Sequence, residues 1–300
     1  MNDRPVTQVQ PGLHQHDKSY IELHLLAAMT MRNCRHAPWY DARFLSCYET
    51  AKAYLAEARP AALAGFEAGF EALRTPPDFA VRKVADLLEP ATLARVRETA
   101  AGIAEERLER HELRDFGRLV VHDHPFFSAL QQDLLPQVSQ LAGRPLTASY
   151  NFLSLYGDAG KCDLHMDEPL AMFTLDFCID QEGDWPLMVS KPIDWPGLET
   201  LRRFEPAEIM ADPALDFRSH VIRANEAILF AGSGQWHYRA PMSTKGFSTL
   251  LFLHYLPAGT ESLAFPPNWS THFDLPELQP LCDLFSELLY ENCLPPGTRA

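Results

Sequence analysis

The sequence has no long hydrophobic run: none of its apolar stretches approaches the roughly 20 residues that a membrane-spanning helix needs. Basic residues are also scarce. The 300 residues include 26 Lys and Arg against 40 Asp and Glu, which gives a formal net charge of −14. Nucleic acids and anionic membranes both attract a basic surface, so we expect this chain to bind neither.

Cysteine pairs are missing as well. The six cysteines include no C-x-x-C pair and follow no regular framework, and the first residues lack the apolar core of a signal peptide. We therefore expect free thiols and a cytoplasmic protein. There is no internal repeat and no low-complexity tract. The 24 prolines lie mostly between the predicted elements, which is typical of many short elements joined by loops.

The first half of the chain is predicted to be mainly helical. Residues 1–18 are polar and form a loose arm, and 19–145 form a helical support region packed on the core. A separate helical domain is the alternative. The predicted helices of this region are 19–32, 42–58, 61–73, 89–112 and 124–141, with isolated strands near 79–84 and 117–122.

From residue 146 the pattern changes to short β runs. Strands are predicted at 147–156, 163–166, 171–180, 186–190, 219–223, 226–231, 235–238 and 247–256. About eight strands at this spacing predict an α+β protein, mainly β, whose core is a double-stranded β-helix (jelly roll) over 146–257. Residues 191–218 interrupt it as a possible lid with a short helix at 206–211, and 258–300 form a C-terminal extension with a helix near 276–292.

A metal site is predicted from three side chains. His165 and Asp167 are two residues apart, so a β-strand would direct both to one face. His237, which follows a short apolar strand about 70 residues later, supplies a third ligand. Two histidines and one carboxylate with open positions form the ligand set of non-haem iron(II) oxygenases. The alternative is a buried His–Asp pair with an unrelated turn histidine.

The segments around these residues resemble the prolyl-4-hydroxylase-like iron(II)/2-oxoglutarate-dependent oxygenases. The family's first motif reads approximately Y-x-x-G-x-x-x-x-x-H-x-D, and here the glycine stands one place later. The resemblance covers about 146–257. Its segments are Tyr156-Gly-Asp-Ala-Gly160-Lys-Cys-Asp-Leu-His165-Met-Asp167, Trp185-Pro-Leu187, Asn225-Glu-Ala-Ile-Leu-Phe230, His237-Tyr-Arg239-Ala-Pro241 and Leu251-Phe-Leu-His-Tyr255.

This resemblance implies a dioxygenase that uses Fe(II), 2-oxoglutarate and O₂, with His165, Asp167 and His237 as iron ligands and Tyr156 near the co-substrate. The distal carboxylate of 2-oxoglutarate needs a buried cation. The family usually places a Lys or Arg nine or ten residues after the second histidine. Here Lys245 stands at eight and Arg239 at two, and both remain candidates.

Other residues carry weaker expectations. Trp185 and Trp236 either line the pocket or fill the core, and Arg202 either clamps an acidic substrate from the lid or is solvated. Asp176 alternates with apolar residues of its strand and is either inward and functional or solvent-facing, of which we expect the second.

We expect a hydroxylase that acts on an unactivated C–H bond of a small molecule, such as an amino acid or a natural-product intermediate. Desaturation and ring formation need the same ligand set. A peptidyl hydroxylase and a non-catalytic jelly-roll binding module are the alternatives, and the sequence does not give the oligomeric state.

Overall fold

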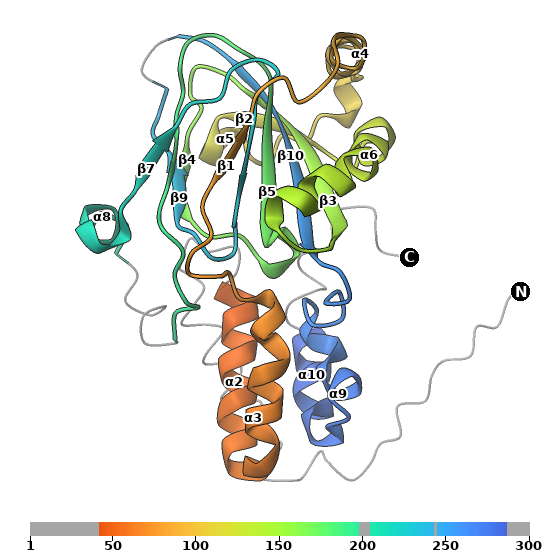
Figure 1. The fold of residues 1–300 in the computed structure, drawn as a ribbon, viewed down its shortest axis with the longest axis vertical. Coiled ribbons are helices and arrows are strands. Elements are labelled where there is room, and N and C mark those ends of the chain that lie inside the picture. The colour runs from red at the N-terminus through yellow and green to blue at the C-terminus, as the bar shows by residue number, and fades with distance from the viewer. Residues whose placement is uncertain (1–41, 198–204, 243–244, 287–300) are drawn as a thin grey trace, which may run out of the picture.

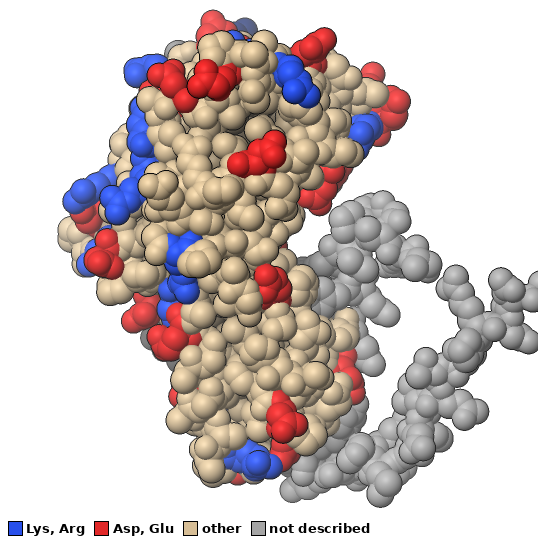
Figure 2. All heavy atoms as spheres, turned by 45° about the vertical axis from the view of Figure 1, so that its right-hand side comes forward, with Lys and Arg blue, Asp and Glu red and all other residues tan. Residues whose placement is uncertain are grey.

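The computed structural model describes residues 42–197, 205–242 and 245–286. Within these ranges the protein is α+β, with two antiparallel sheets above a group of helices (Figure 1). No helix of the described ranges is long and apolar enough to cross a membrane. On the face shown in Figure 2, charged side chains of both signs are scattered among wide uncharged areas.

The larger sheet has six strands in the order β1-β8-β5-β10-β3-β2. At its centre, β10 pairs with both β5 and β3, and each pairing is antiparallel. The strands are β1 (Arg82–Val84), β2 (Arg118–His122), β3 (Leu146–Tyr156), β5 (Phe173–Gln181), β8 (Ala227–Phe230) and β10 (Ser248–Pro257).

The smaller sheet has four strands in the order β4-β9-β6-β7. These are β4 (Cys162–His165), β6 (Leu187–Val189), β7 (Arg218–His220) and β9 (His237–Arg239). Each of the eight strands expected after residue 146 is present, with bounds that differ by at most three residues. Short apolar runs between turns therefore located the strands correctly.

The two sheets pack face to face through a buried apolar cluster. Its members come from both sheets and the connections between them: Tyr156, Cys178, Trp185, Leu187, Val189, Ile222, Ile228, Phe230 and Leu250. Strand β5 is consequently buried on both faces, and Thr174, Asp176 and Cys178 are at most 1% exposed. The expectation that Asp176 faces solvent is wrong, because the second sheet covers the face that the alternation assigned to water.

Two helices cover the outer face of the larger sheet. Helix α6 (Pro125–Ala142) packs on β3, and Gln131 within it donates to the backbone carbonyl oxygens of Tyr150 and His254. Helix α4 (Pro90–Ala101) packs beside β5 (Figure 1). It ends at Gly102, so the expected helix over 89–112 is too long. Residues 105–107 form a 3₁₀ turn (η2), and α5 is the short helix Leu113–Phe116.

A second group of helices lies below the sheets. Helices α2 (Ala42–Ala58) and α3 (Pro60–Gly69) lie beside α9 (Trp269–His272) and α10 (Gln279–Phe285) (Figure 1). The Trp269 ring lies 5.6 Å from that of Phe44 and 5.2 Å from that of Phe70. These rings belong to the same apolar core as the outer face of the larger sheet.

The expected lid is partly described. Its short helix is present as α8 (Pro206–Ala211), and the backbone N–H of Lys191 donates to the carbonyl of Leu215 at 2.8 Å. The expected arm 1–18, the helix 19–32, Arg202 and the end of the last helix lie outside the described residues.

Candidate metal centre

The two histidines of the predicted site are brought together by strand pairing. His165 ends β4, His237 begins β9, and the two residues are direct partners in the antiparallel register. Asp167 follows His165 by two residues, and its backbone N–H donates to the carbonyl of Gly232 at 2.9 Å. The loop between β8 and β9 therefore positions the carboxylate beside both imidazoles.

Their ligand atoms converge. Asp167 Oδ1 lies 3.4 Å from His165 Nε2 and 3.6 Å from His237 Nε2, and one ligand atom from each residue lies within 4.8 Å of the other two. Ligand atoms held at about 2.1 Å from one ion and at right angles are about 3 Å apart. The observed spacing is close to that value, so the three groups fit a single metal ion.

The backbone fixes the tautomer of each imidazole. His165 Nδ1 lies 2.8 Å from the carbonyl oxygen of Asp163, and His237 Nδ1 lies 3.0 Å from that of Gln235. A carbonyl oxygen only accepts, so in both rings Nδ1 carries the hydrogen. In the neutral form of each ring Nε2 therefore carries the lone pair, and both Nε2 atoms face Asp167, which is the arrangement that metal-binding histidines require.

Two residues that the sequence analysis did not identify support Asp167. The hydroxyl of Thr174 on β5 donates to Asp167 Oδ2 at 3.1 Å. A Cβ atom added at Gly232 would lie 2.3 Å from Oδ2, so this glycine leaves the space that the carboxylate fills. The G-S-G turn before Gln235 was the available signal for the second of these contacts.

The charges of the three groups are coupled. Burial alone would raise the pKa of Asp167, but His237 and His165 hold it well below its ordinary value. Burial opposes charge on His165 too, yet Cys162 and Asp167 outweigh it and raise the pKa of His165. Burial and the charge of His165 lower the pKa of His237. Without a metal the group thus holds an ionised carboxylate and a proton that a cation would replace.

Beyond the histidines along β9 lies a buried ion pair. The guanidinium of Arg239, 2% exposed, contacts the carboxylate of Asp176 and donates to the backbone carbonyl of Trp185. The predicted cation Arg239 is therefore inside the protein, but its charge is already paired. Lys245 is exposed, so it is not available as the buried cation that was expected.

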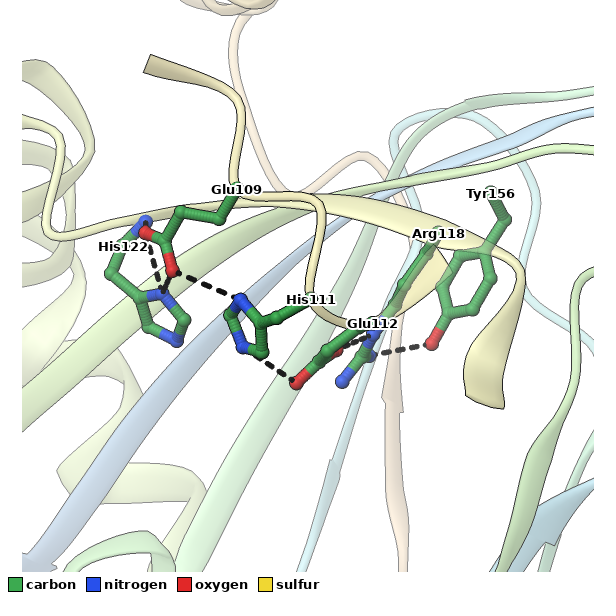
Figure 3. Close-up of polar contacts among 6 residues, drawn as sticks. All are labelled: Glu109, His111, Glu112, Arg118, His122 and Tyr156. Carbon is green, nitrogen blue, oxygen red and sulfur yellow. Dashed lines mark hydrogen bonds and ion pairs between the residues drawn. The ribbon is translucent and has the colours of Figure 1, made fainter. Parts of the chain in front are cut away.

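A second buried arginine was missed from the sequence. Arg118, on edge strand β2, is 7% exposed and lies opposite Tyr156 of β3 in the sheet register. Its Nη1 donates to the Tyr156 hydroxyl at 2.7 Å, and its Nε contacts Glu112 (Figure 3). The contacts continue outward from Glu112 through His111 and Glu109 to His122.

The two tryptophans that were expected to line the pocket or fill the core lie in different parts of the interior. Trp185 lies between the sheets, 4.7 Å from the Tyr156 ring, and its indole N–H donates to the carbonyl of Ala240. Trp236 belongs to the larger apolar core on the other side of β9. The structure thus brings together His165, Asp167 and His237, places Tyr156, Trp185 and Arg239 in the adjoining interior, and separates Trp236 and Lys245 from them.

No family model and no curated protein matches the chain. Solved structures with a similar arrangement of elements include HygX from Streptomyces hygroscopicus with iron bound, at 15% identity and a TM-score of 0.44, over 60% of this chain and 83% of that one. The non-heme alpha ketoglutarate dependent epimerase SnoN from nogalamycin biosynthesis matches at 17% and 0.48, over 66% and 84%. AviO1 from Streptomyces viridochromogenes Tue57 matches at 14% and 0.46, over 64% and 95%.

Proposed function

We propose that this protein is an iron(II)- and 2-oxoglutarate-dependent dioxygenase with a jelly-roll core, and that His165, Asp167 and His237 hold the iron. The observation that carries the proposal is the convergence of both Nε2 atoms on the Asp167 carboxylate. Imidazole nitrogen and carboxylate oxygen are the ligands of the non-haem iron(II) facial triad, which leaves three positions open.

When bound, iron, 2-oxoglutarate and O₂ supply an oxidant for C–H bonds, with succinate and CO₂ as products. The chain's own residues hold the ligands in place. Thr174 occupies Asp167 Oδ2 and leaves Oδ1 for the metal, and the two backbone carbonyls keep each histidine in the Nε2-binding tautomer. Tyr156, buried in the adjoining interior, is the residue that we place beside the co-substrate.

We further propose that the substrate is a small molecule, such as an amino acid or a natural-product intermediate, and that an unactivated C–H bond is hydroxylated. Peptide substrates, desaturation and cyclisation would use the same ligands. The four described cysteines 47, 162, 178 and 282 are free, which supports a cytoplasmic location, and the net charge of −14 supports the expectation of no nucleic-acid or membrane partner.

The test is iron binding under anaerobic conditions, followed by succinate release when 2-oxoglutarate and O₂ are added. Wild-type protein should bind one Fe(II) and release succinate slowly even without substrate, and Asp167→Ala should abolish both. Asp163→Ala is the matched control, because its exposed side chain lies two residues on the other side of His165. Wild-type protein with neither property would favour a non-catalytic binding module, and an active Asp167→Ala protein would disprove the ligand set.

A further inference from the structure

An anion that reaches the interior beside the metal centre must find a cation there. Under the proposed function, on which this inference rests, 2-oxoglutarate binds the metal through its keto acid end and carries a second carboxylate on its far end. Burying that carboxylate without a partner is costly. Among the described residues two arginines are buried, Arg118 and Arg239.

Both arginines have a carboxylate partner, but that of Arg239 is fully buried whereas that of Arg118, Glu112, is partly exposed. Nη2 of Arg239 contacts Asp176, its Nη1 donates to the Trp185 carbonyl, and its Nε is buried without a hydrogen-bond partner among the described residues. A ligand carboxylate bound to Arg239 would lie beside the carboxylate of Asp176, which no water screens. The repulsion between two buried negative charges opposes binding there.

Arg118 is arranged differently. Glu112 engages its Nε and the Tyr156 oxygen engages its Nη1, while Nη2 makes no hydrogen bond within the described part of the chain (Figure 3). A guanidinium has five N–H donors, so Arg118 can bind an anion through the Nη end without releasing Glu112. The aromatic rings of Phe116 and Phe152, 4.9 and 5.1 Å from its central carbon, hold the group in place.

Two neutral donors lie on the neighbouring strand. The Tyr156 oxygen accepts from Arg118, so its own proton is free to be donated, and burial raises the pKa of Tyr156 to about 12, which keeps the hydroxyl protonated. Ser154 lies two residues before Tyr156 and therefore on the same face of β3. Its hydroxyl is fully buried and faces the Tyr156 hydroxyl, whose pKa it lowers, yet no described group lies within ordinary hydrogen-bond distance of it. A ligand oxygen between the two hydroxyls would bind both.

This group of donors is on the same side of the larger sheet as the metal centre. The Arg118 guanidinium lies over the Phe152 ring, 5.1 Å from its centroid, and the Phe152 ring lies 5.4 Å from that of His254. His254 in turn contacts Thr174 at 3.1 Å, and Thr174 donates to Asp167. Arg118 is thus connected to Asp167 through three intervening side chains, of which Phe152 is the first.

We propose that Arg118, with Tyr156 and Ser154, binds the distal carboxylate of 2-oxoglutarate. The cation is then supplied by edge strand β2. The sequence motif had predicted it in the segment after His237. Arg118 and Tyr156 contribute charge and geometry, and Ser154 contributes a hydrogen bond that the protein alone leaves unmade.

The test compares two keto acids on Mn(II)-loaded protein by calorimetry. The first is 2-oxoglutarate, and the second is 2-oxopentanoate, which has the same five carbons with a methyl group in place of the distal carboxylate. Arg118→Gln should weaken 2-oxoglutarate binding by at least about tenfold and change 2-oxopentanoate binding by less than about twofold. Lys245→Ala, the exposed alternative, is the control and should change neither.

Each other result has a distinct meaning. If the wild type binds neither keto acid, the proposed function fails. If it binds 2-oxoglutarate and Arg118→Gln binds it equally well, or if the variant weakens both keto acids alike, the role of Arg118 is refuted. Should Arg118→Gln not fold, Ser154→Ala and Tyr156→Phe decide the matter, because both are milder. Each should weaken 2-oxoglutarate about two- to fivefold with 2-oxopentanoate unchanged, and unchanged 2-oxoglutarate affinity in both would overturn the proposal.

Discussion

Replacing His254 by Asn should remove a large part of the protein's sensitivity to acid. His254 is 3% exposed, its Nδ1 lies 3.1 Å from the Thr174 hydroxyl, and its Nε2 makes no hydrogen bond among the described residues. Thr174 gives its proton to Asp167, so Nδ1 must be the donor to Thr174. Burial lowers the pKa of His254, so the ring is neutral at pH 7. An Asn side chain can still donate from about the Nδ1 position but cannot take up a proton.

The magnitude follows from the pKa. Burial lowers the pKa of His254 from 6.5 to about 4. Between these values the unfolded chain binds a proton that the folded protein excludes, so the free energy of unfolding falls as the pH falls. Each pKa unit corresponds to about 1.36 kcal/mol, so about 2.4 kcal/mol of stability is lost through this residue between pH 7 and pH 4.5.

Urea denaturation of metal-free protein, at constant ionic strength and at both pH values, measures this loss. Wild-type protein should lose about 2.4 kcal/mol more than His254→Asn over the interval. The variant's lower stability at pH 7, caused by its smaller side chain, cancels in the comparison. Equal losses in the two proteins would show that His254 is not held neutral by burial, and the tautomer assigned to it would then lack support.

Two further substitutions test the surroundings of the site. Thr174→Val keeps the shape of the side chain but removes the donor to the carboxylate ligand, so Mn(II) affinity measured by EPR should fall about 10- to 100-fold, and an unchanged affinity would exclude this support. Asp176→Asn leaves the buried charge of Arg239 without its counter-ion and should lower the free energy of unfolding by about 3–5 kcal/mol in urea titrations. Asp180→Asn, near the end of the same strand, is the control; a similar small loss in both variants would contradict the ion-pair interpretation.

The local sequence pattern was sufficient for the elements themselves. Proline at 60 marks the boundary between α2 and α3, and the alternation of apolar residues located β5. The predicted helix over 89–112 was too long because its Ala- and Glu-rich composition continues past Gly102, where the helix ends. Asp176 was misplaced because a strand's pattern does not reveal whether a second sheet lies on its polar face.

The convergence of His165, Asp167 and His237 was predictable because the first two lie at and just beyond the end of one strand and the third follows a recognisable apolar run. The residues that contact this site from other strands were not predictable. Thr174 meets Asp167 only after the connection from β4 turns back onto the larger sheet, and Arg118 meets Tyr156 through the pairing of strands about 40 residues apart. Such contacts depend on strand order, which composition and spacing do not specify.

The helices below the sheets have a consequence for the order in which the chain can be completed during synthesis. Helices α2 and α3 emerge early from the ribosome, whereas Trp269, which packs on their aromatic side chains, is made about 200 residues later. The ion pair between Arg59 and Glu277 closes a similar span. Until then these helices carry an uncovered aromatic surface, which is the kind of surface that chaperones bind. The core can therefore be completed only when α9 and α10 have been made. The group of helices below the sheets assembles after all strands of the sheets have been synthesised.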